Sequence, residues 1–180
     1  MPTPTSNVPT LTTARLTLSA PQLSDFEDSK AMWADPVVVR HVGGHAFTDE
    51  ESWTRLMRAR GLWAVLGFGY WAVRETSTGR YVGEVGFADL RRDLTPSLYD
   101  LPEMGWVLAA WSHGQGFGTE AVGAGLAWID EAMAPPVVPC IIDADNAPSL
   151  ALAAKMGFLI KAHTTYKGSP IVMMERRREG

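Results

Sequence analysis

Cysteine is almost absent from this 180-residue sequence, in which Cys140 is the one example. A single cysteine excludes an internal disulfide and any cysteine-rich metal site. Cys140 falls in the apolar run of residues 137–142, so we expect a buried structural thiol rather than a nucleophile. The four histidines show neither an HExxH motif nor another ligand spacing, and the sequence therefore predicts no metal.

Long apolar runs and a surplus of basic residues are also missing. No run of about 18 apolar residues is present, and the N-terminal stretch MPTPTSNVPT lacks the pattern of a signal peptide. We therefore expect a cytoplasmic protein that does not enter a membrane. The formal net charge of −4 argues against a nucleic-acid partner held by a broad basic surface.

What is present suits one globular domain. Hydrophobic residues make up 46% of the chain and charged residues 20%, which is ordinary for a folded domain with its own core. Residues 1–12 are rich in proline, threonine and serine, and we expect a disordered tail there. A single domain over residues 13–176 and a charged C-terminal tail over residues 177–180 complete the expected organisation.

The stretch around which the chain is organised is residues 103–121, EMGWVLAAWSHGQGFGTEA. An apolar strand is followed by a tight loop from His113 to Gly118, and a helix then begins at Thr119. Glycine lets the main chain approach a ligand, and the N-terminus of a helix offers free N–H groups to an anion. The pattern therefore predicts a loop that holds the pyrophosphate of a nucleotide-bearing molecule.

The hydrophobic pattern predicts about seven strands and about four helices in an α/β (α+β) fold. Strands are expected at residues 15–20, 67–75, 80–90, 103–110, 137–143, 158–166 and 170–176. Helices are expected at residues 23–34, 48–60, 119–134 and 146–156, with Thr48 and Glu51 as a capping box before the second. One βαβ unit surrounds the glycine loop, so strands 103–110 and 137–143 should pair in parallel within a mixed, mostly antiparallel central sheet.

Taken alone, the glycine loop has two interpretations. The spacing Gly116-x-Gly118-x-x-Ala121 matches the dinucleotide fingerprint, and Asp143 or Asp145 lies at a suitable distance for a ribose contact. A dinucleotide-binding fold, however, repeats βαβ units from its first strand. Here an antiparallel hairpin precedes the loop, which weighs against that alternative.

With these motifs in place, the chain resembles the GNAT family of acyl-CoA-dependent N-acyltransferases, most of all the branch that includes ribosomal-protein N-terminal acetyltransferases. The loop follows the branch pattern Q/R-x-x-G-x-G/A, with His113 in place of the usual glutamine or arginine. Residues 103–106, EMGW, match the strand before it, and residues 146–158 contain the matching N-x-x-S-L and K-M-G-F blocks. The resemblance spans about residues 13–175 and implies the GNAT fold.

The resemblance implies acetyl-CoA as the acyl donor, without a metal. Main-chain amides of residues 114–119 would hold the pyrophosphate, and the strand at residues 107–109 would bind the pantetheine arm and polarise the thioester carbonyl. The implied donor-binding residues are Trp106, Val107, Leu108, His113, Gly114, Gln115, Gly116, Phe117, Gly118, Thr119, Asn146 and Ser149.

Transfer to an amine needs a base that takes the ammonium proton and an acid that protonates the leaving thiolate. The resemblance places a frequent general-base position at Glu103, with Glu84 as the reserve candidate. Many members use a tyrosine as the acid, but Ala153 stands at that position here. Ser149 is therefore the candidate for the acid, and its alternative role is to cap the helix that follows Asn146.

The acceptor should lie between the first two helices, the loop before strand 103–110 and the last hairpin. Candidates for its walls are Trp33, Arg40, Trp71 and Trp106. A protein N-terminus and a small-molecule amine both remain open as acceptors, in a monomer or a homodimer. Two alternatives to an N-acetyltransferase also remain, a catalytically weak acyl-CoA-binding module and a dinucleotide-binding protein.

Overall fold

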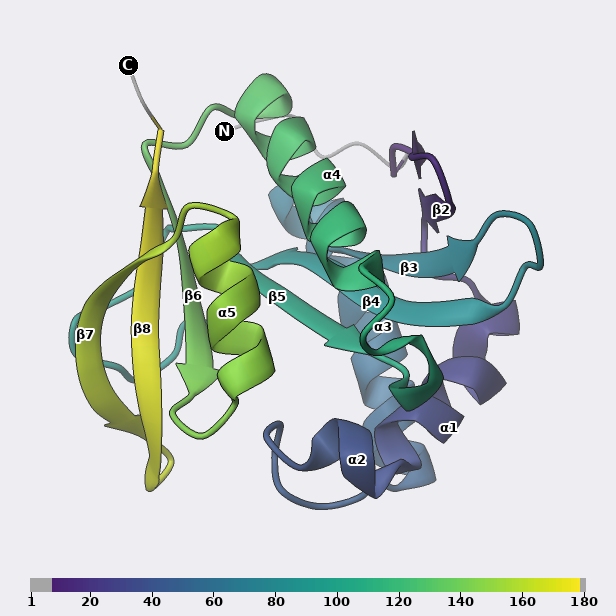
Figure 1. The fold of residues 1–180 in the computed structure, drawn as a ribbon, viewed down its shortest axis with the longest axis horizontal. Coiled ribbons are helices and arrows are strands. Elements are labelled where there is room, and N and C mark those ends of the chain that lie inside the picture. The colour runs from purple at the N-terminus through teal and green to yellow at the C-terminus, as the bar shows by residue number, and fades with distance from the viewer. Residues whose placement is uncertain (1–7, 179–180) are drawn as a thin grey trace.

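The computed structural model describes residues 8–178 and arranges them as two antiparallel sheets with five α-helices (Figure 1). The first sheet has the order β1 (Leu11–Thr12), β2 (Leu16–Ser19), β3 (Tyr70–Glu75), β4 (Tyr81–Ala88) and β5 (Glu103–Leu108). The second has the order β6 (Val137–Asp143), β8 (Ser169–Arg177) and β7 (Leu159–Tyr166). The expected α+β architecture with antiparallel strand pairs is confirmed, with β1 as the strand that the sequence pattern did not predict.

The first residues that the structure describes belong to the fold. Val8 is buried in the core, and Leu11 pairs with Leu18 in the β1–β2 ladder. The predicted disordered tail over residues 1–12 was therefore too long, because residues 8–12 pack against the first sheet. Residues 1–7 and 179–180 of the predicted tails lie outside the described residues.

The helices follow local capping signals. They are the 3₁₀ segments at Leu23–Asp25 and Ala110–Ser112 and the α-helices α1 (Phe26–Ala34), α2 (Pro36–Val39), α3 (Asp49–Leu66), α4 (Phe117–Ala132) and α5 (Ala147–Lys155). The capping box is confirmed, since the Glu51 N–H donates to Thr48 Oγ1 at 3.2 Å and the Thr48 N–H donates to Glu51 Oε2 at 2.8 Å. Helix α3 continues to Gly67, whose φ of +75° ends it in the left-handed region.

Helices cover both faces of the first sheet (Figure 1). Helix α4 covers the face that carries Trp71 and Phe87, and a Cβ on Gly125 would already touch the methyl end of Met104 at 3.2 Å. Helix α1 lies on the other face, which carries Glu84. The first core cluster includes an edge-to-face contact between Trp63 and Trp71, with ring centroids 4.8 Å apart.

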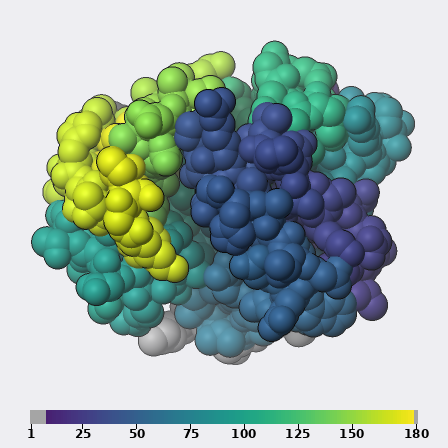
Figure 2. Space-filling view, turned by 90° about the horizontal axis from the view of Figure 1, so that it is seen from below, coloured from purple at the N-terminus to yellow at the C-terminus, as the bar shows by residue number. Residues whose placement is uncertain are grey.

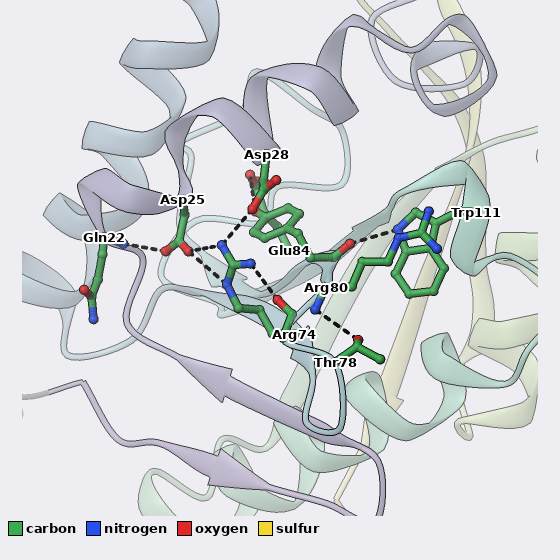
Figure 3. Close-up of polar contacts among 10 residues, drawn as sticks. Gln22, Asp25, Asp28, Arg74, Thr78, Arg80, Glu84 and Trp111 are labelled. Atoms are coloured by element: carbon green, nitrogen blue, oxygen red, sulfur yellow. Dashed lines mark hydrogen bonds and ion pairs between the residues drawn. The ribbon is translucent and has the colours of Figure 1, made fainter.

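An ion-pair network fastens the start of α1 to β3. Arg74 on β3 donates to Asp25 Oδ1 at 2.7 Å and to Asp28 Oδ2 at 2.9 Å, as Figure 3 shows. Burial lowers the pKa of Arg74, but the hydrogen bonds and charges of Asp25 and Asp28 outweigh it and raise the pKa. On the far side of the same hairpin, the Arg80 guanidinium lies 3.8 Å from the ring centroid of Trp111 (Figure 3). The first set of contacts holds α1 against β3, and the second holds the β3–β4 hairpin against the 3₁₀ segment at Ala110–Ser112.

The parallel pairing expected between strands 103–110 and 137–143 is not formed. Within residues 8–178, β5 pairs only with β4, and β6 pairs only with β8. The start of β5 lies beside the middle of β6, and the two strands then diverge, as Figure 1 shows. A helical crossover fixes the direction of the strands that it joins, but it does not require a ladder between them. The single central sheet of the sequence analysis is therefore split in two at the β5–β6 boundary.

Candidate active site

The larger cavity, which we call the donor cavity, has a volume of about 760 Å³ and lies where β5 and β6 diverge. Its walls come from α2, the end of β5, the glycine loop and the start of α5. Of the residues predicted for the donor or acceptor, those that line it are Arg40, Trp106, Val107, Leu108, His113, Gly114, Gly116, Gly118, Thr119, Asn146 and Ser149. Seen from below, the dark blue segment that carries α2 lies beside the green and yellow C-terminal half (Figure 2).

The glycine loop turns sharply into α4. Gly114 and Gly116 have φ of +72° and +80°, a region that glycine enters at little cost, and α4 begins at Phe117. The first turn of a 16-residue helix thus opens on the donor cavity, where its free N–H groups favour an anion. A Cβ on Gly118 would lie 3.1 Å from Leu152 Cδ2, so the close packing of this loop on α5 depends on the missing side chain.

Two predicted donor residues, Gln115 and Phe117, do not line the cavity with their side chains. Gln115 Nε2 donates to the Trp111 carbonyl at 2.7 Å, and the Phe117 ring is buried. Behind the loop, Arg15 stacks on Phe117 at 4.5 Å and donates to the Gln115 carbonyl at 2.9 Å. The contact predicted for these two residues is made by their main-chain amides, and it stays a prediction.

His113 occupies the position at which the branch usually has glutamine or arginine. Its Nε2 lies 2.9 Å from the carbonyl oxygen of Leu108, at the end of β5. The ring therefore folds back on the strand while still lining the donor cavity. It supports the geometry of the loop rather than extending a cation into the cavity.

The start of α5 faces the end of β5. Asn146 is the N-cap, and its Oδ1 accepts from the Ser149 N–H at 3.2 Å, so the side chain that caps α5 is that of Asn146. The Ser149 hydroxyl in turn accepts a hydrogen bond from the Trp106 indole N–H at 3.3 Å. Because the indole can only donate, the hydroxyl proton of Ser149 remains available to another acceptor.

A smaller cavity of about 120 Å³, which we call the acceptor cavity, adjoins the first. The residues that line both are His41, Val42, Trp106, Val107, Asn146 and Ser149. The acceptor cavity is further lined by charged and polar side chains, among them Arg55, Tyr70, Arg92, Glu103 and Asp143. The two cavities therefore meet at Trp106 and Ser149.

Glu103 begins β5 and forms a buried ion pair. The Arg92 Nε donates to Glu103 Oε2 at 2.7 Å, and the Arg92 guanidinium also lies 4.9 Å from the Tyr166 ring centroid. Burial lowers the pKa of Arg92, but its hydrogen bond and charge interaction with Glu103 outweigh it and raise the pKa. Burial first, and then the Glu103 charge, raise the pKa of the neighbouring Tyr70. Glu103 is only 5% exposed and lines the acceptor cavity, as its predicted role requires.

Glu84, the reserve candidate for the base, belongs to the core instead. Its Oε1 accepts from Ser29 Oγ at 2.6 Å, from Trp33 Nε1 at 3.2 Å and from the Tyr81 hydroxyl at 3.3 Å. Burial, followed by the Glu84 charge, raises the pKa of Tyr81 well above its ordinary value. Glu84 lines neither cavity, so the structure corrects this candidate to a structural carboxylate beneath α1.

Two tryptophans predicted as acceptor walls are also in the core. Trp33 and Trp71 are both 0% exposed, and neither lines a cavity. The Trp71 indole donates to the Pro9 carbonyl at 2.8 Å within the core cluster on the α4 side of the sheet. Of the four predicted wall residues, Arg40 and Trp106 line the cavities. The prediction was wrong for Trp33 and Trp71, because large aromatic side chains are more often buried in the core.

Several lining residues were missed by the sequence reasoning. His41 lines both cavities, and its Nδ1 lies 3.4 Å from Asp143 Oδ1, which ties the segment after α2 to the end of β6. Arg55 and Arg92 line the acceptor cavity from α3 and from the loop before β5. No local motif marks these residues, since each reaches the site from a different element.

Other expectations concern residues away from the cavities. Cys140 is buried, and burial together with the Glu103 charge raises the pKa of its thiol far above the ordinary value, which fits a structural thiol. Among residues 8–178, no three His, Cys, Asp or Glu side chains gather into a metal-binding group. In the same part of the chain, no helix has the length and apolar character needed to cross a bilayer.

Comparison with known proteins gives a consistent result. The family model for the acetyltransferase (GNAT) domain matches residues 15–159. A Bordetella pertussis protein assigned to the GnaT acetyltransferases is 29% identical, with a TM-score of 0.83 over 94% of this chain and 99% of the other. An acetyltransferase from Agrobacterium tumefaciens is 24% identical, with a TM-score of 0.83 over 96% of each chain. RimL, a ribosomal-protein alpha-N-acetyltransferase in complex with coenzyme A, is 14% identical and shares the fold with a TM-score of 0.75 over 94% of this chain and 98% of its own.

Proposed function

This chain belongs to the GNAT family of acetyltransferases, and we propose that it moves an acetyl group from acetyl-CoA to a primary amine by direct attack. The observation that carries the proposal is the meeting of the two cavities at Trp106 and Ser149. One cavity has the glycine loop and helix N-terminus that suit a pyrophosphate, and the other has a buried carboxylate. The dinucleotide-binding alternative is dropped, because the family match covers the loop that suggested it.

The donor cavity suits acetyl-CoA. Its volume of about 760 Å³ lies in the range of cofactor sites, and it runs from the glycine loop along the end of β5. The amides of residues 114–119 would hold the pyrophosphate, while the main chain of Val107 and Leu108 would bind the pantetheine arm. This edge of β5 makes no ladder within residues 8–178, so its peptide groups can serve a ligand.

Glu103 is the proposed general base. A primary amine is mostly ammonium near pH 7, since an α-amino group has a pKa of about 7.7–8.0 and a lysine about 10.4. Glu103 would take this proton directly or through a water molecule, and the neutral amine would attack the thioester carbon. A main-chain N–H of β5 would polarise the thioester oxygen while the tetrahedral intermediate forms.

Ser149 is the proposed general acid. Collapse of the intermediate forms the amide and breaks the carbon–sulfur bond, which releases the CoA thiolate. The Ser149 hydroxyl, which already accepts from Trp106, can donate its own proton toward that sulfur. Ala153 is fully buried in α5, so no side chain at the usual tyrosine position reaches the site. Direct attack needs no cysteine nucleophile, which agrees with the burial of Cys140.

The proposed acceptor is either a protein N-terminus or a small-molecule amine. A thiol-release assay with acetyl-CoA over a panel of both kinds of amine tests the proposal directly. We expect turnover with at least one class, together with thermal stabilisation by acetyl-CoA or CoA and none by NAD or FAD. Tight binding of CoA without turnover on any amine would leave only an acyl-CoA-binding module.

A further inference from the structure

Arg55 is the one guanidinium at the acceptor cavity that makes no hydrogen bond within residues 8–178. Its Nε is fully buried without a partner, and the nearest carboxylate oxygen, Oε2 of Glu84, lies 3.6 Å away. A guanidinium has five N–H donors and no acceptor, and buried donors are seldom left unsatisfied. The Arg55 side chain as a whole is 19% exposed and lines the cavity, so its terminal nitrogens are donors there that no group of residues 8–178 hydrogen-bonds.

The Arg55 side chain is nevertheless held in place. Its guanidinium stacks on the Trp33 ring, with the central carbon 3.6 Å from the ring centroid, and the Phe47 ring lies 5.9 Å away. Stacking on a fully buried indole fixes the plane of the guanidinium while leaving its edge free. A planar edge of this kind suits a planar carboxylate, which it can bind through two parallel hydrogen bonds.

The neighbouring carboxylates leave the terminal nitrogens of Arg55 without a hydrogen bond. Glu84 accepts three hydrogen bonds on Oε1 from Ser29, Trp33 and Tyr81, and its Oε2 forms only a long ion pair with Arg55 Nε at 3.6 Å. Glu103 is paired with Arg92 at 2.7 Å. The two arginines of the cavity thus differ, because Arg92 has a carboxylate of this chain and Arg55 has none within hydrogen-bond distance.

The field around the cavity also favours an anion at this end. Burial lowers the pKa of Arg58, one turn after Arg55 on α3, and the charges of Arg55 and then Arg92 lower it further. The three guanidinium groups of Arg55, Arg58 and Arg92 therefore lie close enough to repel one another. The carboxylates near them are those of Glu84 and of Glu103, which is already paired with Arg92. A further carboxylate of the cavity lining, Asp143, lies 3.4 Å from His41 Nδ1.

We propose that the acceptor carries a carboxylate close to its amine, and that Arg55 binds this carboxylate while the amine faces Glu103. This inference rests on the proposed function of the same site. The acceptor cavity, with a volume of about 120 Å³, has room for a carboxylate. The shared chemistry can come from a free α-amino acid or from an acidic residue at the N-terminus of a peptide.

The test compares matched acceptors that differ only in the carboxylate. Free α-amino acids are paired with their carboxamides, and peptides that begin with Asp are paired with peptides that begin with Asn. Thiol release gives kcat and KM for each, and calorimetry on the CoA-saturated protein gives binding. We expect wild-type protein to prefer the carboxylate member by about tenfold in kcat/KM, as a charge-assisted hydrogen bond allows.

The Arg55→Gln variant should lose this preference through KM, with kcat within about twofold of wild type. Arg55→Lys keeps the charge but not the planar fork, and should retain a preference of about threefold. Arg60→Gln is the control, because Arg60 lies on the same helix and is exposed. If Arg55→Gln does not fold, the Arg55→Lys comparison carries the test.

The outcomes separate the two proposals. The inference is overturned if wild-type protein has equal kcat/KM for both members of every pair. It is also overturned if the Arg55 variants lose kcat/KM equally for both members. Either result leaves the acetyltransferase proposal intact. If no amine is acetylated, the proposed function fails, and the binding arm alone decides the inference. Binding of carboxylate members that depends on Arg55 then supports it, and its absence overturns it. The pair that shows the preference identifies the source of the carboxylate.

Discussion

The donor and acceptor cavities meet at the side chains of Trp106 and Ser149, but different parts of the polypeptide form them. The donor cavity is shaped by main chain, glycines and a helix terminus, and its one folded-back side chain, His113, serves the strand behind it. The acceptor cavity is shaped by charged side chains that converge from α3, β3, β5, β6 and the loop before β5. A site formed by main chain suits a ligand that stays the same, such as the acyl donor. The specificity of a site formed by side chains can be altered by single substitutions.

This difference predicts how the two cavities respond to substitution. Side-chain changes should matter most in the acceptor cavity, since its function resides in ionised groups. Binding in the donor cavity should tolerate most side-chain changes. It should be lost mainly where a substitution replaces a glycine of the loop and adds a Cβ. Substitutions in and around the two cavities test this difference.

The largest effect is expected from Glu103→Gln in the acceptor cavity. Loss of a general base costs about 10²–10⁴ in rate, and we expect kcat to fall at least about 100-fold with loss of the acidic limb of the pH–rate profile. Asp130→Asn is the matched control, because Asp130 also pairs with an arginine, Arg176 at 2.6 Å, but lies outside both cavities. A pH–rate profile that Glu103→Gln leaves unchanged would remove Glu103 as the base.

The next largest effect is expected in the donor cavity from Gly116→Val. A branched residue at a φ of +80° stores a few kcal/mol of strain or reshapes the loop, so KM for acetyl-CoA should rise about thirtyfold with kcat within about twofold. Gly168→Val is the control, since Gly168 has a φ of +83° in the β7–β8 turn with open space around it. The control should lose similar stability and keep its KM. An equal rise in KM for both variants would show that strain alone, not the loop, was responsible.

A smaller effect is expected from Ser149→Ala at the junction. We expect kcat to fall about tenfold, because the thiolate loses its proton donor and the Trp106 indole loses its acceptor. Ser149→Thr should restore part of kcat, since it keeps the hydroxyl. The contrary result is a lower unfolding temperature with unchanged kcat, which would assign Ser149 only to the start of α5.

The smallest effect concerns the support of the glycine loop. Glu120 in the first turn of α4 accepts hydrogen bonds from Thr13 and Arg15, and these outweigh its burial and lower its pKa below the ordinary value of 4.5. A lowered carboxyl pKa stabilises the fold above pH 4.5, and this contribution is lost as the pH falls through the folded-state pKa.

Glu120→Gln should therefore lower the free energy of unfolding by about 0.5–1 kcal/mol at pH 7 and by less at pH 3. Urea unfolding at both pH values measures the difference. Glu131→Gln, an exposed change on the same helix, is the control and should match wild type at both pH values. A deficit in Glu120→Gln that is as large at pH 3 as at pH 7 would contradict the predicted linkage.

The donor cavity could be predicted from the sequence because its signals are local. The glycines between His113 and Thr119, and the Asn146 cap three residues before Ser149, depend on neighbours in the chain. The acceptor cavity could not, because its contacts join distant residues. Glu84 is held in the core by a hydrogen bond from Ser29, which is 55 positions away in the sequence. Arg55 likewise stacks on Trp33, a residue of another helix.

The separation of β5 from β6 has a consequence for solubility. A strand edge that stays open for a ligand is also an edge on which a strand of another molecule could pair, and exposed edges of this kind promote aggregation. Here the open edge of β5 lies at the bottom of a cavity walled by α2 and α5, which leaves room for a thin ligand but screens the edge from another sheet. The outer strand β7, with Leu159 and Ile160 largely exposed, is the less protected edge of the molecule.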